Sequence, residues 1–398
     1  MSAIIAVIGL VSGVFQSINT PESWMAPPHA SSTKVRVYAG MSGSTSQSTS
    51  GNIPGVALWD AAGGFIGKAM GVYNYVIDDG KFHDLEVKGK KASAEYLSVS
   101  AFGTDGLCMA AVAVTSPTGY KAGWFGDIGR KCGAPWYPSN LVIPGSDPEA
   151  RPACVWIDQD GSNNHPYTGL TIHLPSFTGA GLAQEYNDNI DTLCRSLPRF
   201  SMWTTRSVHM TLPVYYADRL EFNEDGSDKN LSAILDPQMM QSETTAPNDP
   251  TGTALGVADG PSALDLAPVA QLAPSRRWTR RQSQISRPRP QPLQDQLVVS
   301  NISSHSAREL CGSRTSAGPD FVSMGEGLFC DMMRKVLSPL CSEEVTAACF
   351  DLGERGLRVV GGAQELETED PEGRLELRVR SEDGGPRLKA YRNVQRWS

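Results

Sequence analysis

The feature that most constrains this chain is its set of eight cysteines, which fall into two groups of four. The groups are Cys108, Cys132, Cys154 and Cys194, and then Cys311, Cys330, Cys341 and Cys349. Zinc sites built from cysteine normally contain close Cys-x-x-Cys pairs, and this chain has none, so two disulfides per group are favoured over a metal site. Disulfide frameworks belong to oxidising compartments, which predicts a secreted protein. Four cysteines allow three connectivities, so the pairing stays open at this point.

The N-terminus carries an apolar run from Ala3 to Phe15. The run has the length of the hydrophobic part of a signal peptide and is too short to span a bilayer. It lacks the usual basic flank, so a buried first strand or helix is the alternative. We predict a signal peptide over residues 1–18 and an extracellular protein that does not span a membrane. Two N-glycosylation sequons, at Asn230 and Asn301, fit secretion.

Between about residues 34 and 175, short runs of alternating apolar residues are separated by glycine, proline, asparagine and aspartate. Val35 and Val37 share one face of such a run, and Leu97 and Val99 share one face of another. When every second residue is apolar, one face of the strand is buried, and this pattern is typical of an antiparallel sheet. Many strands without intervening helices predict a mainly β fold, an antiparallel β-sandwich or jelly-roll-like domain over residues 30–235.

One helix is expected within this β-rich domain. Its apolar residues recur at helical spacing before Pro198 ends the run, and they are Leu182, Tyr186, Ile190, Leu193 and Leu197. Cys194 would then join the helix to the sheet.

Residues 237–295 are rich in proline, serine, threonine, glutamine and arginine. Such a composition cannot bury enough apolar surface to offset the entropy of the chain, so we predict a disordered linker. Its dibasic pairs, at 276–277 and 280–281, are either processing sites or a solvated basic stretch. Both cysteine groups lie outside the linker, which places a small cysteine module at residues 300–398. With 398 residues the chain exceeds what one hydrophobic core usually serves, in agreement with two domains.

The second cysteine group lies in a distinctive pattern. It includes Cys311, residues 318–323 (GPDFVS), 329–332 (FCDM), Pro339, Cys341, 349–351 (CFD), Tyr391, Val394 and Trp397. This pattern resembles a C-terminal module of secreted proteins of filamentous ascomycete fungi. The segments AGWFGDIGRKCGAPWY and CVWIDQDGSNN resemble the N-terminal part of the same proteins. The resemblance implies a compartment and an architecture, but no reaction.

A search for catalytic motifs gives little support for an enzyme. The chain has no G-x-S-x-G, no H-E-x-x-H, no P-loop and no G-x-G-x-x-G fingerprint after a strand. His173 lies in the run LTIHLP, whose alternation predicts that it faces solvent. Asp127 and Asp158 are the candidates for a carboxylate pair, which glycoside hydrolysis requires at a defined separation.

The leading hypothesis is a secreted, non-catalytic protein that binds a polysaccharide or a cell-surface glycan. Aromatic rings that could stack on sugars are Trp124, Phe125, Trp136, Tyr137 and Trp156. The alternative for these rings is a place in the core around Cys132 and Cys154. The alternative function is a secreted hydrolase that uses carboxylates. A net charge of −8 argues against a nucleic-acid-binding protein, which would normally present a basic surface.

Calcium is the one cofactor that the sequence suggests. Oxygen-bearing side chains alternate around Gly161, at Asp158, Asp160, Ser162 and Asn164, as in the first half of a calcium loop. Gly169 occupies the twelfth position in place of the glutamate of such loops. The alternative is a polar hairpin turn, which the same residue types form well.

Overall fold

The structure is a computed structural model, and it divides the chain into two compact units. It describes residues 29, 31–40, 49–142, 151–161, 165–177, 180–204, 211–245, 295–358, 368–369, 375–376, 387–388 and 391–398. The predicted signal peptide over 1–18 and the dibasic pairs lie outside these residues. The described part of the first unit ends at residue 245, and that of the second unit begins at residue 295.

The first unit is built on one antiparallel sheet with the strand order β10-β11-β8-β1-β6-β4-β3-β7-β12-β13, in which β9 also pairs with β8. The strands are β1 (Ser32–Ala39), β3 (Gly55–Trp59), β4 (Phe65–Ala69), β6 (Phe82–Gly89), β7 (Tyr96–Ser100), β8 (Leu107–Thr115), β9 (Lys121–Phe125), β10 (Trp136–Tyr137), β11 (Cys154–Ile157), β12 (Gly169–His173) and β13 (Phe200–Trp203). The predicted fold class, mainly β with antiparallel sheets, is confirmed.

The sheet folds back on itself. The ring of Trp124 on β9 stacks on the ring of Phe200 on β13, with centroids 5.6 Å apart, although these strands belong to opposite ends of the strand order. Strands β3, β7, β8, β11 and β12 are buried along their whole length, as expected where both faces of a sheet are covered. The two layers of a sandwich therefore come from one long sheet.

Two further strand pairs complete the described part of this unit. One joins β2 (Gly51–Ile53) to β5 (Val72–Ile77), and the other joins β14 (Thr211–Tyr216) to β15 (Met240–Thr245). The predicted linker therefore begins too early. Residues 237–245 form the 3-10 helix η2 (Pro237–Met239) and strand β15, whose polar backbone is paired by β14. The rest of the predicted linker, residues 246–294, lies outside the described residues.

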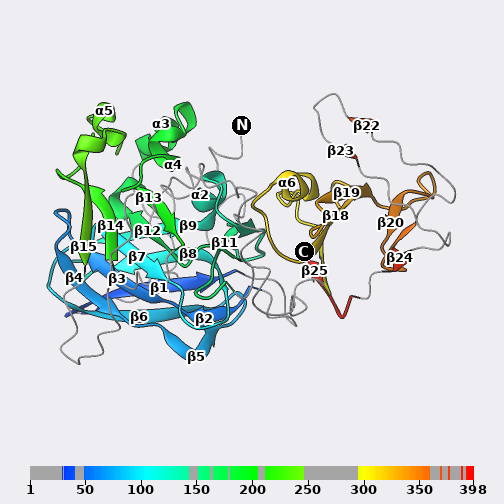
Figure 1. The fold of residues 1–398 in the computed structure, drawn as a ribbon, viewed down its shortest axis with the longest axis horizontal. Helices are drawn as coiled ribbons and strands as arrows, with labels where there is room; N and C mark the ends of the chain where they lie inside the picture. The colour runs from blue at the N-terminus through cyan, green and yellow to red at the C-terminus, as the bar shows by residue number, and fades with distance from the viewer. Residues whose placement is uncertain are drawn as a thin grey trace, which may run out of the picture. The chain divides into compact units, whose positions relative to one another are not determined.

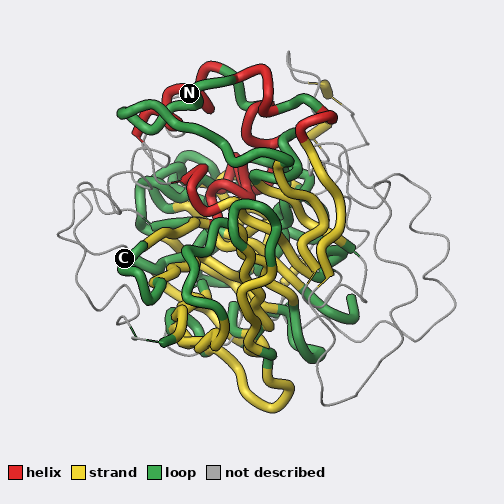
Figure 2. Tube along the Cα trace, turned by 90° about the vertical axis from the view of Figure 1, so that its left-hand side faces the viewer, coloured by secondary structure: helices red, strands yellow, loops and turns green. Residues whose placement is uncertain are grey.

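The single predicted helix is two short helices, α3 (Ala180–Asp188) and α4 (Asp191–Cys194). The break lies at Asn189, whose side chain accepts a hydrogen bond from the Asp191 N–H (3.2 Å). Such local hydrogen bonding by asparagine competes with helix continuation. Helix α5 (Leu231–Ile234) follows later in the chain, and in Figures 1 and 2 it lies with α3 and α4 at the top of the unit, above the strands.

All eight cysteines form disulfides within their own groups, as predicted. The pairs are Cys108–Cys154, Cys132–Cys194, Cys311–Cys330 and Cys341–Cys349. The first pair joins strands β8 and β11. The second joins α4 to the end of helix α2 (Gly126–Lys131), an element that the sequence did not predict, so Cys194 is linked to a helical turn and not to the sheet.

The second unit contains a mixed five-stranded sheet with the order β19-β18-β17-β16-β25 (Figure 1). Its elements are β16 (Gln296–Ser300), α6 (Ala307–Gly312), β17 (Asp320–Ser323), β18 (Leu328–Asp331), β19 (Val336–Pro339) and β25 (Asn393–Trp397), and shorter strands are β20 (Cys349–Asp351), β21 (Gly356–Arg358), β22 (Thr368–Glu369), β23 (Leu375–Glu376) and β24 (Arg387–Leu388). Strand β16 runs parallel to both β17 and β25. Phe329, Phe350 and Tyr391, from the pattern that carries the fungal resemblance, pack in the core of this unit.

Candidate binding surface

The five aromatic side chains predicted to stack on sugars are all buried. Their exposed fractions are at most 3%, for Trp124, Phe125, Trp136, Tyr137 and Trp156. They lie on β9, β10 and β11, which the folded sheet and helix α2 cover, and Trp156 stacks on the ring of His165. A stacking surface made of these rings was therefore the wrong prediction. The alternative, a place in the core, is the one that the structure shows.

The predicted carboxylate pair is also buried. Asp127 Oδ2 accepts a hydrogen bond from the Ala153 N–H (3.1 Å), and Asp127 Oδ1 lies 3.6 Å from the Arg130 guanidinium. Asp158 is 1% exposed, and its Oδ1 accepts a hydrogen bond from the Asp160 N–H (3.3 Å). Both carboxylates are buried, at 6% and 1% exposure.

The segment considered for calcium is described only in part. The Asp158–Asp160 contact is the local hydrogen bond of a turn, as the alternative interpretation expected. Ser162 and Asn164 lie outside the described residues. Among the residues that the structure does describe, no group of three or more histidines, cysteines, aspartates and glutamates is arranged to hold a metal ion.

His173 is buried, against the prediction that it faces solvent. Strand β12 pairs with β7 on one side and β13 on the other, and all five of its residues are buried. Both faces of the strand are therefore covered, so the alternation of its residues does not separate a buried face from a solvent-exposed one. His173 Nδ1 lies 2.7 Å from Ser176 Oγ, and His173 Nε2 lies 3.9 Å from Glu95 Oε2. Burial lowers the pKa of His173. The three groups resemble a nucleophile, base and orienting acid, but the Ser176 hydroxyl is enclosed with 0% exposure, so it meets no substrate here.

A second buried network surrounds Arg199, which is fully enclosed. The guanidinium donates to Asp228 Oδ2 and lies 3.7 Å from Glu185 Oε1. The Asp228 N–H donates to Glu185 Oε2 (3.1 Å), so two carboxyl groups meet at one cation. Burial and the neighbouring Asp228 raise the pKa of Glu185 to about 7. This network joins α3, the turn before β13 and the segment before α5.

Six of the nine large apolar side chains that are exposed in the described part of the first unit lie in one stretch of sequence. Between residues 70 and 82 they are Met70, Val72, Tyr73, Tyr75, Val76 and Phe82. Most of them belong to β5, which pairs with β2 alone among the described strands. In Figure 1, β5 lies at the lower margin of the unit, at the end opposite to α3 and α5. Five of the six residues of β5 are exposed. Contiguous exposed apolar patches on soluble proteins are often interaction sites.

Strand β5 carries a bulge that presents two tyrosines. Asn52 pairs with Val76 and Ile53 with Val72, so residues 73–75 have no partner on β2. The buried Asn52 side chain replaces that partner, because its Nδ2 donates to the carbonyls of Tyr73 (2.8 Å) and Tyr75 (3.5 Å). Bulges of this kind re-aim side chains at functional edges of sheets.

The loop between β7 and β8 completes this surface. Asn52 Oδ1 accepts a hydrogen bond from the Asp105 N–H (2.9 Å), and the Phe102 ring lies 4.1 Å from the Tyr73 ring. Gly103 has φ +85°, and a Cβ there would lie 2.3 Å from Asn52 Oδ1, so only glycine fits. The Phe102 ring itself is buried, at 9% exposure. We call Tyr73, Tyr75 and Asp105 the β5 surface.

The β5 surface was not predicted from the sequence. The run VYNYVI contains five apolar residues, which fall on both faces of a strand, so a period-two pattern assigns it no buried face. Two tyrosines that flank an asparagine in such a run were the available signal. Nothing local shows that Asn52, some 20 residues earlier, holds the bulge.

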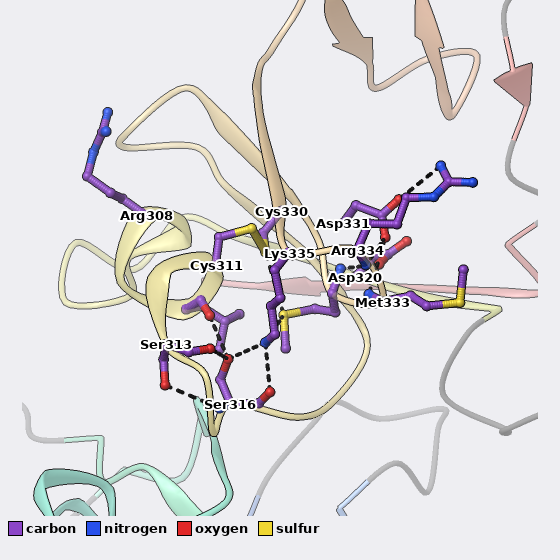
Figure 3. The surroundings of a disulfide bond; sticks show 12 residues. Arg308, Cys311, Ser313, Ser316, Asp320, Cys330, Asp331, Met333, Arg334 and Lys335 are labelled. Atoms are coloured by element: carbon purple, nitrogen blue, oxygen red, sulfur yellow. Dashed lines mark hydrogen bonds and ion pairs between the residues drawn. A yellow bond between two sulfur atoms is a disulfide. The ribbon is translucent and has the colours of Figure 1, made fainter. Parts of the chain in front are cut away.

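In the second unit, polar contacts surround the Cys311–Cys330 disulfide (Figure 3). The Lys335 ammonium donates to the Ser316 carbonyl (2.7 Å) and to the Ser316 hydroxyl. Burial lowers the pKa of Lys335 to about 8. Figure 3 shows this side chain pointing to Ser316 and away from Arg308, which lies on α6 beside a shallow depression. These contacts hold the segment after β18 against the loop that precedes β17.

Both sequon asparagines are exposed, Asn230 before α5 and Asn301 after β16. No helix among the described residues is long and apolar enough to cross a membrane. A scan of protein-family models found none that matches the chain, and a search of curated proteins found no match. The function must therefore follow from the residues of this chain.

Proposed function

We propose that this chain is a secreted protein that binds carbohydrate through the β5 surface. Tyr73 and Tyr75 are 57% and 68% exposed. Tyrosine offers a large apolar ring with a polar end at a low cost in side-chain entropy, which suits it to stacking on a sugar ring while the hydroxyl bonds to sugar hydroxyls. Tyr73 and Tyr75 thus take the role that we predicted for the five buried aromatic residues, and carbohydrate binding remains the proposed function.

The observation that carries the proposal is the bulge held by Asn52. The side-chain nitrogen of Asn52 donates to the carbonyls of Tyr73 and Tyr75, and its side-chain oxygen accepts a hydrogen bond from the Asp105 N–H. The two tyrosines are therefore displayed on a fixed backbone, although they gain little burial there. Such preorganisation lowers the entropy lost when a ligand binds.

A binding screen of the full chain against cell-wall polysaccharides and defined oligosaccharides tests the proposal. Tyr75→Ala is expected to weaken binding about tenfold, because it removes a stacking partner. Leu231→Ala, which truncates an exposed side chain on α5, serves as the control and should bind as the parent does. If no glycan binds, or if Tyr73→Ala and Tyr75→Ala both bind like the parent, the proposal fails.

Asn52→Ala separates display from contact, because Asn52 is buried and touches no ligand. The variant keeps both tyrosine side chains but loses the amide that bonds to the carbonyls of Tyr73 and Tyr75. Weaker binding with an unchanged set of bound glycans is expected. A fully retained affinity would show that the bulge needs no such support.

Secretion is the second part of the proposal. It is supported by the four disulfides and by the exposed sequons at Asn230 and Asn301. Mass spectrometry of the protein from culture supernatant should find eight oxidised cysteines and a glycan on at least one sequon. Recovery from the cytosol with eight free thiols would contradict it.

A further inference from the structure

The β5 surface joins its aromatic rings to one carboxylate. Asp105 and Asn52 exchange two hydrogen bonds, from the Asp105 N–H to Asn52 Oδ1 (2.9 Å) and from the Asn52 N–H to the Asp105 carbonyl (3.3 Å). The same Asn52 amide binds the carbonyl of Tyr73, whose ring contacts Phe102 at the start of the Asp105 loop. The carboxylate and the two tyrosines therefore stand on backbone segments that one side chain holds together.

The Asp105 carboxylate differs from Asp84 and Glu86, the two ion-paired carboxylates of strand β6. Asp84 pairs with Arg36 (2.6 Å), and Glu86 pairs with Lys34 (3.1 Å). Within the described part of the chain, no side chain or N–H is bonded to the carboxylate of Asp105. The side chain reaches solvent, yet protein atoms crowd around it, and this partial desolvation raises the pKa of Asp105. A partly desolvated anion without a countercharge favours a cationic partner.

The aromatic rings favour the same kind of partner. The face of a tyrosine ring attracts cations through the ring quadrupole, and both tyrosines of the β5 surface are exposed. An ammonium group beside these rings would also form a charge-assisted hydrogen bond to a carboxylate, which is stronger than a bond between neutral groups. A neutral sugar gains only stacking there, and an anionic glycan is repelled both by Asp105 and by the net charge of −8.

We propose that the β5 surface binds a glycan of amino sugars with free primary ammonium groups, and that Asp105 selects it over the acetylated and the neutral glycan. This inference rests on the proposed carbohydrate binding and adds the chemical class of the ligand. Tyr73 and Tyr75 provide the stacking that all sugars share. Asp105 provides the discrimination.

The test compares three oligosaccharides of equal length and linkage, made of glucosamine, N-acetylglucosamine and glucose, by titration calorimetry on the full chain. It is run at about pH 6, where a carboxyl group is ionised and an amino group is protonated. The parent is expected to bind the glucosamine oligomer about tenfold more tightly than the other two. Asp105→Asn should abolish this preference and leave the weaker binding unchanged. Its melting temperature checks that the fold is intact.

Asp218→Asn is the matched control, because Asp218 is also exposed and lies in a loop after β14. It should keep the full preference for the glucosamine oligomer. Equal affinities of the parent for all three oligomers, or a preference that survives in Asp105→Asn, would overturn the inference. In that case Tyr75→Ala still decides the proposed function, since stacking on any of the oligomers depends on it. Absence of binding to all three and to the wider glycan screen would overturn both.

Discussion

Replacing Glu185 by glutamine is expected to stabilise the protein at pH 8 while leaving its stability near pH 5 unchanged. Glu185 Oε2 accepts the Asp228 N–H (3.1 Å), and both carboxyl groups approach the buried Arg199. Burial and Asp228 favour the protonated form of Glu185 in the folded state. Glutamine has the shape of protonated glutamate, and its amide N–H can donate a hydrogen bond as the carboxyl O–H does. The substitution should therefore keep the network and remove the contribution of residue 185 to the pH dependence of stability.

The size of the effect follows from linkage. The pKa of Glu185 is raised from 4.5 to about 7. A raised folded-state pKa means that the folded protein binds more protons than the unfolded one, so stability is fully present below pH 4.5 and falls as pH rises to about 7. At 1.36 kcal/mol per pKa unit the full loss is about 3 kcal/mol. Because the side chain keeps 11% exposure, solvent screening reduces this to about 1.5 kcal/mol.

Calorimetric melting of the parent and of Glu185→Gln between pH 4.5 and 8 measures this difference. In the variant the melting temperature should exceed that of the parent by about 3–6 °C at pH 8 and match it near pH 5. The comparison cancels groups that are present in both proteins and lie away from Glu185. Glu221→Gln is the control, since Glu221 is 73% exposed beside Lys229. A difference that stays constant across this pH range would refute the reasoning.

Three further predictions concern the disulfides, the β5 surface and calcium. Removing Cys132–Cys194 by double substitution to serine should lower the stability of the first unit by about 4 kcal/mol in denaturant unfolding, and removing Cys341–Cys349 should lower that of the second by about 2.5 kcal/mol, because the bridges close loops of 62 and 8 residues. Gly103→Ala should lower the free energy of unfolding by about 1–3 kcal/mol and weaken glycan binding. Gly119→Ala is the control, because Gly119 also has a positive φ (+84°) but no atom lies within 4 Å of the added Cβ; it should lower stability less and leave binding intact. Equal losses of stability in the two variants would mean that contact with Asn52 is unimportant. If the segment at Asp158 and Asp160 holds calcium, chelator should lower the melting temperature and Asp160→Ala should erase that difference, whereas identical melting of the parent in calcium and in chelator would leave the segment a turn.

The sequence by itself determined the parts of the fold that depend on local pattern and on counting. Alternating residues such as Val35 and Val37 predicted antiparallel strands, and both lie on β1. The division of the cysteines into two groups of four predicted disulfides within each group, because close Cys-x-x-Cys pairs are missing. The composition of residues 237–295 predicted a boundary between two units, and the units divide within this range, at residues 286 and 287. Each of these properties is carried by residues near one another in the chain.

Only the tertiary structure decided which faces are covered and which groups meet. Alternation shows that His173 and Ile172 lie on opposite faces of a strand, but not that the folded sheet covers both faces. The same covering places Trp124 against Phe200 in the core. The pairing of the cysteines likewise depends on contacts between distant segments. At the β5 surface, Asn52 reaches from β2 to hold Tyr73, so the display of that ring results from a long-range hydrogen bond, and no local pattern encodes such a bond.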